Sequence, residues 1–328
     1  MSDTYNYSIK ELTEKILNGG TAAKEEAMFL AEQQLEELCT AADEIRQKFC
    51  GNSFDICTII NGKSGRCSED CKYCAQSIHY QTEIEKYPLL GTDEIVRQAV
   101  NNGARGVLRY SIVTSGKKLS ADEVDKICAS IRAVRQQSGL AVCVSLGLLN
   151  EEQFRKLKAA GTSRVHCNLE TSRNYFPSVC TTHTYNEKIA TLQAAKRAGL
   201  SICCGGIIGL GETMEDRIDM VLTARELGVK SIPVNILNPI QGTPYENNRI
   251  LTNEDICRIV AIFRFLIPDA SIRLAGGRGL LPDKGRTCFS SGANAAISGD
   301  MLTTTGITIE TDMQMLNELG YKAALWNE

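Results

Sequence analysis

The chain has 328 residues, of which 43% are hydrophobic and 23% charged, and its formal net charge is -3. This is the composition of a globular enzyme, and the absence of a basic excess argues against nucleic acid as a partner. The N-terminus lacks the positive start and apolar run of a signal peptide, and no apolar stretch reaches the roughly 18 residues of a membrane-spanning helix. We therefore expect a cytoplasmic protein with neither nucleic-acid nor membrane partners.

The first predicted element is a helical region over residues 8–50, with Ser8 and Thr21 as expected N-caps. A Gly-Gly pair at residues 19–20 is expected to divide it into two helices, because glycine weakens a helix interior. We interpret residues 1–50 as an N-terminal helical extension that precedes the main domain.

From residue 54 onward, short runs rich in β-branched residues alternate with longer amphipathic patterns, which is typical of repeated βα units and a parallel sheet. We expect strands at residues 54–60, 106–114, 140–146, 164–170, 201–208, 231–237, 271–275 and 293–297. We expect helices at residues 92–102, 121–137, 150–160, 186–198, 214–227, 253–266 and 311–319, and a loop between the last two strands. Eight strands predict an α/β fold, a (β/α)8 TIM-type barrel over residues 51–322, closed or incompletely closed, with a tail at residues 323–328. Its active site should lie at the C-terminal ends of the strands.

The motif with the clearest chemistry follows the first expected strand, where Cys67, Cys71 and Cys74 have the spacing C-x3-C-x2-C. Thiolates are soft ligands for zinc or an iron-sulfur cluster. A zinc site needs a fourth ligand, and the next candidate, His79, has no partner pattern. Three thiolates on a four-iron cluster leave one iron open for a small molecule. This is the arrangement of the radical S-adenosylmethionine (SAM) enzymes, which the loop resembles in its spacing and in the aromatic Tyr73.

Side-chain alternation predicts which strand residues face the barrel interior. On the fourth strand, His166, Asn168 and Glu170 should face inward, whereas Cys167 should pack under a helix. The chain has 14 cysteines with irregular spacings outside the loop, which argues against a disulfide framework. We expect most of them to be buried packing residues.

Three further strands carry candidate groups. The third strand has Cys143, and only one of the adjacent Cys203 and Cys204 can face inward on the fifth. Arg273 lies in an otherwise apolar strand, which indicates an anionic ligand in the barrel or, alternatively, a structural ion pair. The glycines of residues 209–211 either let the backbone approach a flat ligand such as adenine or serve a tight strand-to-helix turn.

Considered together, these segments resemble the biotin synthase family over about residues 8–322. Their order and separation make the resemblance specific. The matching segments are residues 65–77, 143–147, 168–172, 181–185, 205–213, 235, 242–244, 273–276, 292–294 and 302–304.

The resemblance implies that Cys67, Cys71 and Cys74 bind a 4Fe-4S cluster whose open iron holds SAM. Reductive cleavage of SAM then gives methionine and a 5'-deoxyadenosyl radical, and sulfur is inserted into dethiobiotin to form biotin. The resemblance also implies a reducing electron donor such as flavodoxin or ferredoxin, and a homodimer.

By the same resemblance, Glu170 holds the SAM ribose hydroxyls, at a position where the family pattern has aspartate, and residues 206–212 line the adenine. Asn168 and Asn235 would hold the ureido ring of dethiobiotin. The implied SAM-binding residues are Tyr73, Asn168, Glu170, Gly206, Ile207, Gly209 and Glu212, and the implied substrate-binding residues are His166, Asn168 and Asn235.

In the family, a second iron-sulfur cluster deeper in the barrel donates the sulfur and is held by three cysteines and an arginine. Cys143, Cys203 and Arg273 match three of these positions. The strand-two cysteine falls at Ser111, and a serine oxygen is a hard, poor substitute for a thiolate.

Three alternatives follow for this second cluster. It is a 2Fe-2S cluster with Ser111 as a weak ligand, or a different cluster such as a four-iron one with other or fewer protein ligands, or it is absent and the activity has changed. We favour the second alternative, and the joint retention of the other three ligands argues against the third. The reserve ligands are Cys167, Cys180, Cys204 and His166, of which side-chain alternation disfavours Cys167 and Cys204.

Two other functions compete with this interpretation. One is another radical SAM enzyme of related barrel fold, hydrogenase-maturase-like or mutase-like, which has no reason to retain Asn235 or the deep ligand set. The other is a non-catalytic iron-sulfur or zinc-binding protein, which predicts no SAM cleavage under a strong reductant. A metal-binding module does not need a barrel with polar residues facing its interior, which argues against this second function.

Overall fold

A computed structural model describes residues 7–326. Residues 1–6 and 327–328 lie outside the described residues. They include the start of the predicted N-terminal extension and the end of the predicted tail. In the described part of the chain, no helix is both long enough and apolar enough to cross a membrane.

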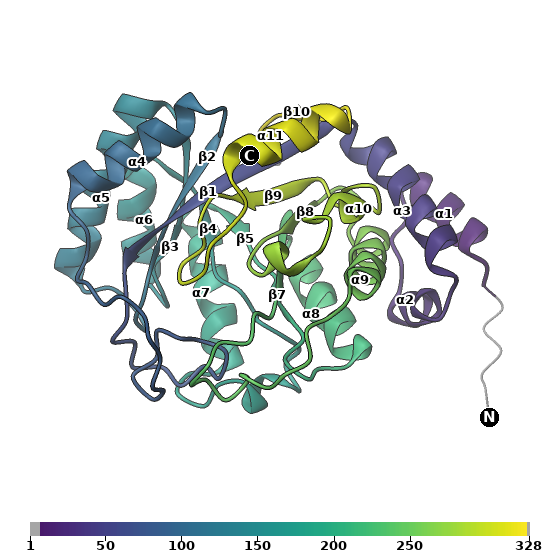
Figure 1. Ribbon diagram of the computed structural model, residues 1–328, viewed down its shortest axis with the longest axis horizontal. Helices are drawn as coiled ribbons and strands as arrows, with labels where there is room; N and C mark the ends of the chain where they lie inside the picture. The colour runs from purple at the N-terminus through teal and green to yellow at the C-terminus, as the bar shows by residue number, and fades with distance from the viewer. Residues whose placement is uncertain (1–6, 327–328) are drawn as a thin grey trace.

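Parallel strands form a closed barrel inside a ring of helices, as Figure 1 shows. The barrel strands are β1 (Ser53–Lys63), β2 (Arg109–Thr114), β3 (Ala141–Ser145), β4 (Thr162–His166), β5 (Ser201–Cys203) with β6 (Gly206–Ile208), β7 (Ser231–Ile236), β8 (Ser271–Leu274) and β9 (Ala295–Ser298). Each pairs with the next in parallel, and β9 pairs with β1. The predicted (β/α)8 barrel is therefore confirmed, in its closed form.

The outer helices are α4 (Thr92–Ala104), α5 (Ala121–Ser138), α6 (Glu151–Ala160), α7 (Tyr185–Arg197), α8 (Met214–Glu226), α9 (Asn253–Leu266) and α11 (Ile309–Glu318). Most of them start at a capping box, in which a side-chain oxygen of the N-cap residue accepts the N–H three residues later. These N-caps are Ser120, Asn150, Thr184, Thr213 and Thr252. The predicted helices are thus confirmed to within two residues at most ends. The expected loop before β9 also contains a short helix, α10 (Arg286–Phe289).

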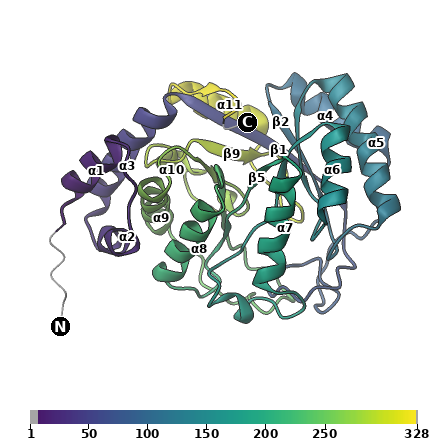
Figure 2. The same ribbon diagram turned by 180° about the vertical axis from the view of Figure 1, so that it is seen from behind.

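The N-terminal region forms three helices rather than the two that we predicted: α1 (Ile9–Leu17), α2 (Lys24–Ala31) and α3 (Leu35–Cys50). Ser8 caps α1 as expected. Thr21 does not cap α2, because the N-cap is Ala23, two residues later, where the Glu26 carboxylate accepts the Ala23 N–H at 2.7 Å. In both Figure 1 and Figure 2 these helices lie outside the barrel, where α3 contacts α9 and α2 contacts α8 and α9.

One strand was not predicted. β10 (Lys322–Ala323) pairs with the start of β1 through Ser53 and Phe54. The limits that we predicted for the extension, the barrel and the tail, residues 1–50, 51–322 and 323–328, remain predictions, and β10 crosses the last of them.

The fifth barrel strand is interrupted between β5 and β6 rather than continuous as predicted. The break brings two glycines against neighbouring backbone. A Cβ on Gly205 would lie 2.1 Å from the Pro233 carbonyl oxygen, and one on Gly206 would lie 2.3 Å from that of Glu170. Only glycine allows this close approach, which places the adjacent Ile207 at the barrel mouth.

Candidate active site

A cavity of about 370 Å³ extends from the barrel interior to the loops at the C-terminal ends of the strands. Most of the residues predicted for the site line it. These are Cys67, Tyr73, Cys74, Ser111, Cys143, His166, Asn168, Glu170, Cys203, Ile207, Asn235 and Arg273. Four predicted residues do not line it: Cys71, Gly206, Gly209 and Glu212. Cys167 and Cys204 pack in the apolar core instead, as side-chain alternation requires.

The cysteine loop is held over the cavity by backbone hydrogen bonds. The N–H of Cys67 donates to the Gln76 carbonyl at 3.0 Å, and the N–H of Ile78 donates to the Cys67 carbonyl at 2.9 Å. Cys67 and Cys74 line the cavity. The Cys71 thiol instead donates to the sulfur of Cys180 at 3.6 Å.

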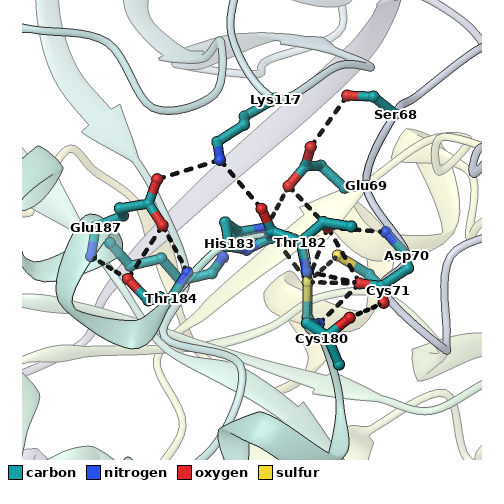
Figure 3. A network of polar contacts seen from close by, with 12 residues as sticks. Ser68, Glu69, Asp70, Cys71, Lys117, Cys180, Thr182, His183, Thr184 and Glu187 are labelled. Atoms are coloured by element: carbon teal, nitrogen blue, oxygen red, sulfur yellow. Dashed lines mark hydrogen bonds and ion pairs between the residues drawn. The ribbon is translucent and has the colours of Figure 1, made fainter.

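The loop is anchored to residues 180–183 by a network of polar contacts that Figure 3 shows. The Asp70 carboxylate accepts the N–H groups of Thr181 and Thr182 at 2.8 and 3.1 Å, and Glu69 pairs with His183 at 2.7 Å. Two acidic residues between the cysteines therefore fix the loop without using the thiols. These contacts hold the loop beside the barrel mouth.

Cys180 lies within this network, beside the loop and outside the deep cavity. Its sulfur is 3.3 Å from Nδ1 of His183. The hydrogen bond from the Cys71 thiol lowers the pKa of Cys180 to about 4. Burial opposes this shift, and the contact with His183 adds to it. Because it contacts Cys71, Cys180 is badly placed to be a reserve ligand for the deep cluster. The ligand atoms of Cys71, Cys180 and His183 lie within 4.8 Å of one another, so they can also share a metal ion.

His166 and Asn168 form one hydrogen-bonded unit in the cavity wall. The Asn168 Oδ1 accepts the Gly205 N–H at 3.2 Å and lies 2.9 Å from His166 Nε2. Since that oxygen can only accept, His166 donates from Nε2, and its Nδ1 is free to accept from Ser145 at 3.2 Å. Burial lowers the pKa of His166, so the imidazole is neutral.

Glu170 has a buried carboxylate with one uncommitted oxygen. Its backbone has a positive φ of 71°, and its Oε1 lies 3.4 Å from Lys188 Nζ. Among the described residues, its Oε2 has no hydrogen-bond partner. A buried carboxylate oxygen without a partner is costly, so this oxygen is suited to a ligand hydroxyl.

Around the turn after β6, Ile207 belongs to a small apolar cluster separate from the main core. The cluster joins Ile207 with Val179, Leu210 and Leu237, and Tyr73, Tyr175 and Tyr245 pack against it. Glu212 is engaged in the turn itself, since its Oε1 accepts from the Gly209 N–H at 2.9 Å and from Arg217 at 2.6 Å. The turn therefore offers the cavity an apolar surface rather than polar groups.

Asn235 lines the cavity from β7, and both ends of its amide hold the backbone. Its Nδ2 donates to the Gly206 carbonyl and its Oδ1 accepts the Gly276 N–H, both at 3.0 Å. The amide keeps a second N–H and a second lone pair for a ligand. Asn235 therefore both joins neighbouring strands and presents a fixed polar group.

Arginines surround the base of the cavity. Oδ2 of Asp55, on β1, lies 3.1 Å from Arg273, 3.3 Å from Arg109 and 3.5 Å from Arg164. Burial raises the pKa of Asp55, but the three guanidinium groups outweigh it and lower it to about 2. Arg273 thus has the structural ion-pair partner that we considered as the alternative to an anionic ligand, and it also lines the cavity.

Beside the arginines lie three buried thiols, of which the sequence interpretation identified two. Cys143 and Cys203 line the cavity as expected, and Cys57 on β1 lines it with them. Burial raises the pKa of Cys57 to about 12 and that of Cys143 to about 11, and Arg109 opposes the shift of both. Cys57 lies two residues after Asp55 on β1, so side-chain alternation was the signal that could have placed it in the barrel interior. Our sequence analysis had included Cys57 only as part of the first predicted strand.

Comparison with known proteins places this site in a class of enzymes. The model of the radical SAM superfamily matches residues 63–224, and that of the biotin and thiamin synthesis associated domain matches residues 233–322. Two solved structures share the fold. Methylornithine synthase has a TM-score of 0.84 at 19% identity, and the match covers 96% of this chain and 97% of that chain. The FeFe-hydrogenase maturase HydG from Carboxydothermus hydrogenoformans has a TM-score of 0.81 at 15% identity, and the match covers 96% of this chain and 79% of that chain. The protein is thus a radical SAM enzyme with an iron-sulfur cluster and SAM as cofactors.

Sequence relatives define it further. Biotin synthase of Brachyspira hyodysenteriae is 58% identical over 97% of this chain and 96% of that protein. Biotin synthase 2 of Corynebacterium diphtheriae is 57% identical over 99% of this chain and 98% of that protein. The chain belongs to the biotin synthase family.

Proposed function

We propose that this chain converts dethiobiotin to biotin with two iron-sulfur clusters, one at each end of the cavity. The observation that carries this proposal is the position of the thiols. Cys67 and Cys74 line the mouth of the same cavity whose interior is lined by Cys143 and Cys203. A molecule that lies between them is within reach of both.

At the mouth, Cys67, Cys71 and Cys74 would hold the 4Fe-4S cluster, whose thiol donor set suits iron. When bound together with SAM, this cluster supplies the radical that removes hydrogen from an unactivated carbon. Cys71 contacts Cys180 in the structure and would join its neighbours as a ligand after its side chain turns toward the cavity. The loop backbone keeps its anchoring contacts in either position, because they come from Glu69 and Asp70.

SAM would lie between the loop and the fourth and fifth barrel strands. The uncommitted Glu170 oxygen is placed to accept from the ribose hydroxyls, and Lys188 holds the carboxylate in position. Ile207 and Tyr73 supply apolar surface for the adenine. Gly206, Gly209 and Glu212 act on this site only through the shape of the turn.

Dethiobiotin would lie deeper, against β4 and β7. Asn235 presents its remaining N–H and lone pair to the ureido ring, and Asn168 is held by His166 for the same purpose. Because His166 is neutral, no extra charge is buried beside an uncharged ring. The barrel wall excludes water, which protects a radical from side reactions.

The sulfur would come from a second cluster bound by Cys143 and Cys203 near Arg273. A 2Fe-2S cluster and a four-iron cluster remain the two alternatives for its composition. We also propose a low-potential electron donor, flavodoxin or ferredoxin, and a homodimer.

The decisive assay combines reconstituted protein, dethiobiotin, SAM and dithionite under anaerobic conditions, with biotin and 5'-deoxyadenosine both quantified. We expect biotin to form and the protein to contain more than about four irons per chain. SAM cleavage without biotin would favour a maturase-like or mutase-like enzyme. No cleavage would indicate a binding protein, for which the Cys71, Cys180 and His183 trio is the metal site.

A further inference from the structure

Cys57 is a buried thiol that no sequence motif singled out, and it faces the cavity from β1. We propose that Cys57 is the third thiolate ligand of the deep cluster, so that the thiol missing at Ser111 is supplied from the neighbouring strand. This inference rests on the proposed function, since it completes the ligand set of its sulfur donor.

The register of the strands shows which inward-facing residues lie at the same level in the barrel. In an eight-stranded barrel with a shear of eight, a level perpendicular to the axis advances by one residue from each strand to the next. Cys57 pairs with Arg109, so its level meets β2 at Tyr110. Tyr110 pairs with Val142, and the next residue on β3 is Cys143. Cys57 and Cys143 therefore lie at one level.

The same steps continue around the barrel. They lead from Cys143 to Cys203 on β5 and then to Arg273 on β8. One more step returns to Cys57 on β1. The residues crossed on the intervening strands are Val165, Ile232 and Ala296. Alternate strands thus contribute one closed layer of four side chains, made of three thiols and a guanidinium group.

Ser111 belongs to a different layer. It pairs with Cys143, so its own level meets β3 one residue further toward the C-terminal end and reaches His166 on β4. The other members of this layer are Pro233 and Ile297. The serine therefore lies above the layer that contains the two matching cysteines, whereas Cys57 lies within it.

Packing separates Cys57 from an ordinary buried cysteine. Cys128, Cys167 and Cys204 belong to the apolar core, where cysteine acts as a small hydrophobic residue. Cys57 is 4% exposed, but like Cys143 and Cys203 it is not part of that core and borders the cavity and the arginines instead. The guanidinium groups favour the thiolate forms that bind iron. Its thiol has a hydrogen bond to the Thr58 carbonyl at 3.4 Å, which a ligated sulfur can give up.

The test isolates the deep site. A Cys67/Cys71/Cys74 triple alanine protein is the parent, and Cys57→Ala, Cys143→Ala and Ser111→Ala are each added to it. Cys167→Ala serves as the control for loss of a buried thiol outside the cavity. Each protein is reconstituted anaerobically with iron and sulfide, and iron, sulfide and the Mössbauer spectrum are measured. Circular dichroism and thermal unfolding establish that each variant is folded.

We expect Cys57→Ala and Cys143→Ala to lower the deep-site iron at least about fivefold, whereas Ser111→Ala and Cys167→Ala retain it. If Cys57→Ala does not fold, Cys57→Ser keeps the shape of the site and should lose the parent spectrum. If a Cys57 variant keeps the iron content and spectrum of the parent, the assignment of Cys57 as a ligand is wrong, but the proposed function is unaffected. A parent without iron would overturn the deep cluster of the proposed function as well, so the two failures are distinguishable.

Discussion

The loop and the deep layer are both rich in thiols, but they are assembled differently. Cys67, Cys71 and Cys74 lie on one short segment, whose position depends on local backbone bonds and on the contacts of Glu69 and Asp70. The deep layer takes one side chain from each of four strands, and it exists only when the barrel has closed in the correct register. In the loop only Cys67 and Cys74 line the cavity while Cys71 contacts Cys180, whereas all four side chains of the deep layer line it.

This difference predicts that the two sites fail independently. The first prediction concerns Cys74→Ala. We expect loss of both 5'-deoxyadenosine and biotin formation by more than about 100-fold, because the open-iron cluster needs all three thiolates. Iron should fall by about four per chain while the iron of the deep site stays. Cys128→Ala, a buried thiol remote from both sites, is the matched control. Loss of all iron from Cys74→Ala would show that the sites depend on each other.

The second prediction concerns Cys203→Ala, in a protein whose loop is intact. Biotin formation should fall by more than about 100-fold while 5'-deoxyadenosine still forms at a reduced rate, because radical generation does not need the sulfur donor. Both products are measured in the same reaction. Cys204→Ala, the adjacent residue that packs in the core, should retain biotin formation. Normal biotin formation by Cys203→Ala would show that the sulfur donor is misassigned.

The third prediction concerns stability in cluster-free protein. Asp55→Asn leaves buried guanidinium groups without their shared carboxylate, and loss of one partner from such a buried cluster costs about 3–5 kcal/mol. Cys74→Ala in the loop should change the free energy of unfolding by no more than about 1 kcal/mol. Urea unfolding measures both.

An exposed ion pair supplies the control for this experiment. Arg286 and Glu318 are 2.7 Å apart with side chains 43% and 45% exposed, so Glu318→Ala should cost less than about 1 kcal/mol. Equal losses for Asp55→Asn and Glu318→Ala would contradict the view that the buried cluster of Asp55 with Arg273, Arg109 and Arg164 stabilises the fold.

The same contrast explains what the sequence could predict. Hydrophobic runs predicted the eight strands, amphipathic patterns predicted the outer helices, and Ser8 was correctly predicted as the N-cap of α1. Alternation correctly placed His166 in the interior, and the family resemblance selected Cys203 rather than Cys204 on the fifth strand, where Cys203 does line the cavity. The start of α2 was missed, because it is capped by the carboxylate of Glu26 in its own first turn rather than by a side chain at the N-cap.

Cys57 was missed for a different reason. Its importance depends on its level relative to Cys143 and Cys203, which is a property of strand register and barrel closure. No spacing along the chain encodes that level. The partner of Arg273 was missed in the same way, since Asp55 is brought to it only when β8, β9 and β1 come together.

The smallest predicted effect lies between the two sites, where SAM would bind. Glu170→Gln removes the charge and one acceptor from the oxygen that has no partner among the described residues. A hydrogen bond to a charged group contributes about 1.5–3 kcal/mol, so we expect the Kd for SAM to rise at least about tenfold. Equilibrium dialysis of the reconstituted protein measures this affinity directly.

Glu212→Gln is the matched variant for this last prediction, since Glu212 is also a buried glutamate near the barrel mouth but does not line the cavity. We expect its Kd for SAM to change by less than about threefold, with the main effect on the stability of the turn through Gly209 and Arg217. Equal effects of the two variants would mean that the carboxylates act on SAM only through the shape of the barrel mouth. A selective effect of Glu170→Gln would place SAM between the loop and the deep layer, as transfer of sulfur from one end of the cavity to a carbon activated from the other end requires.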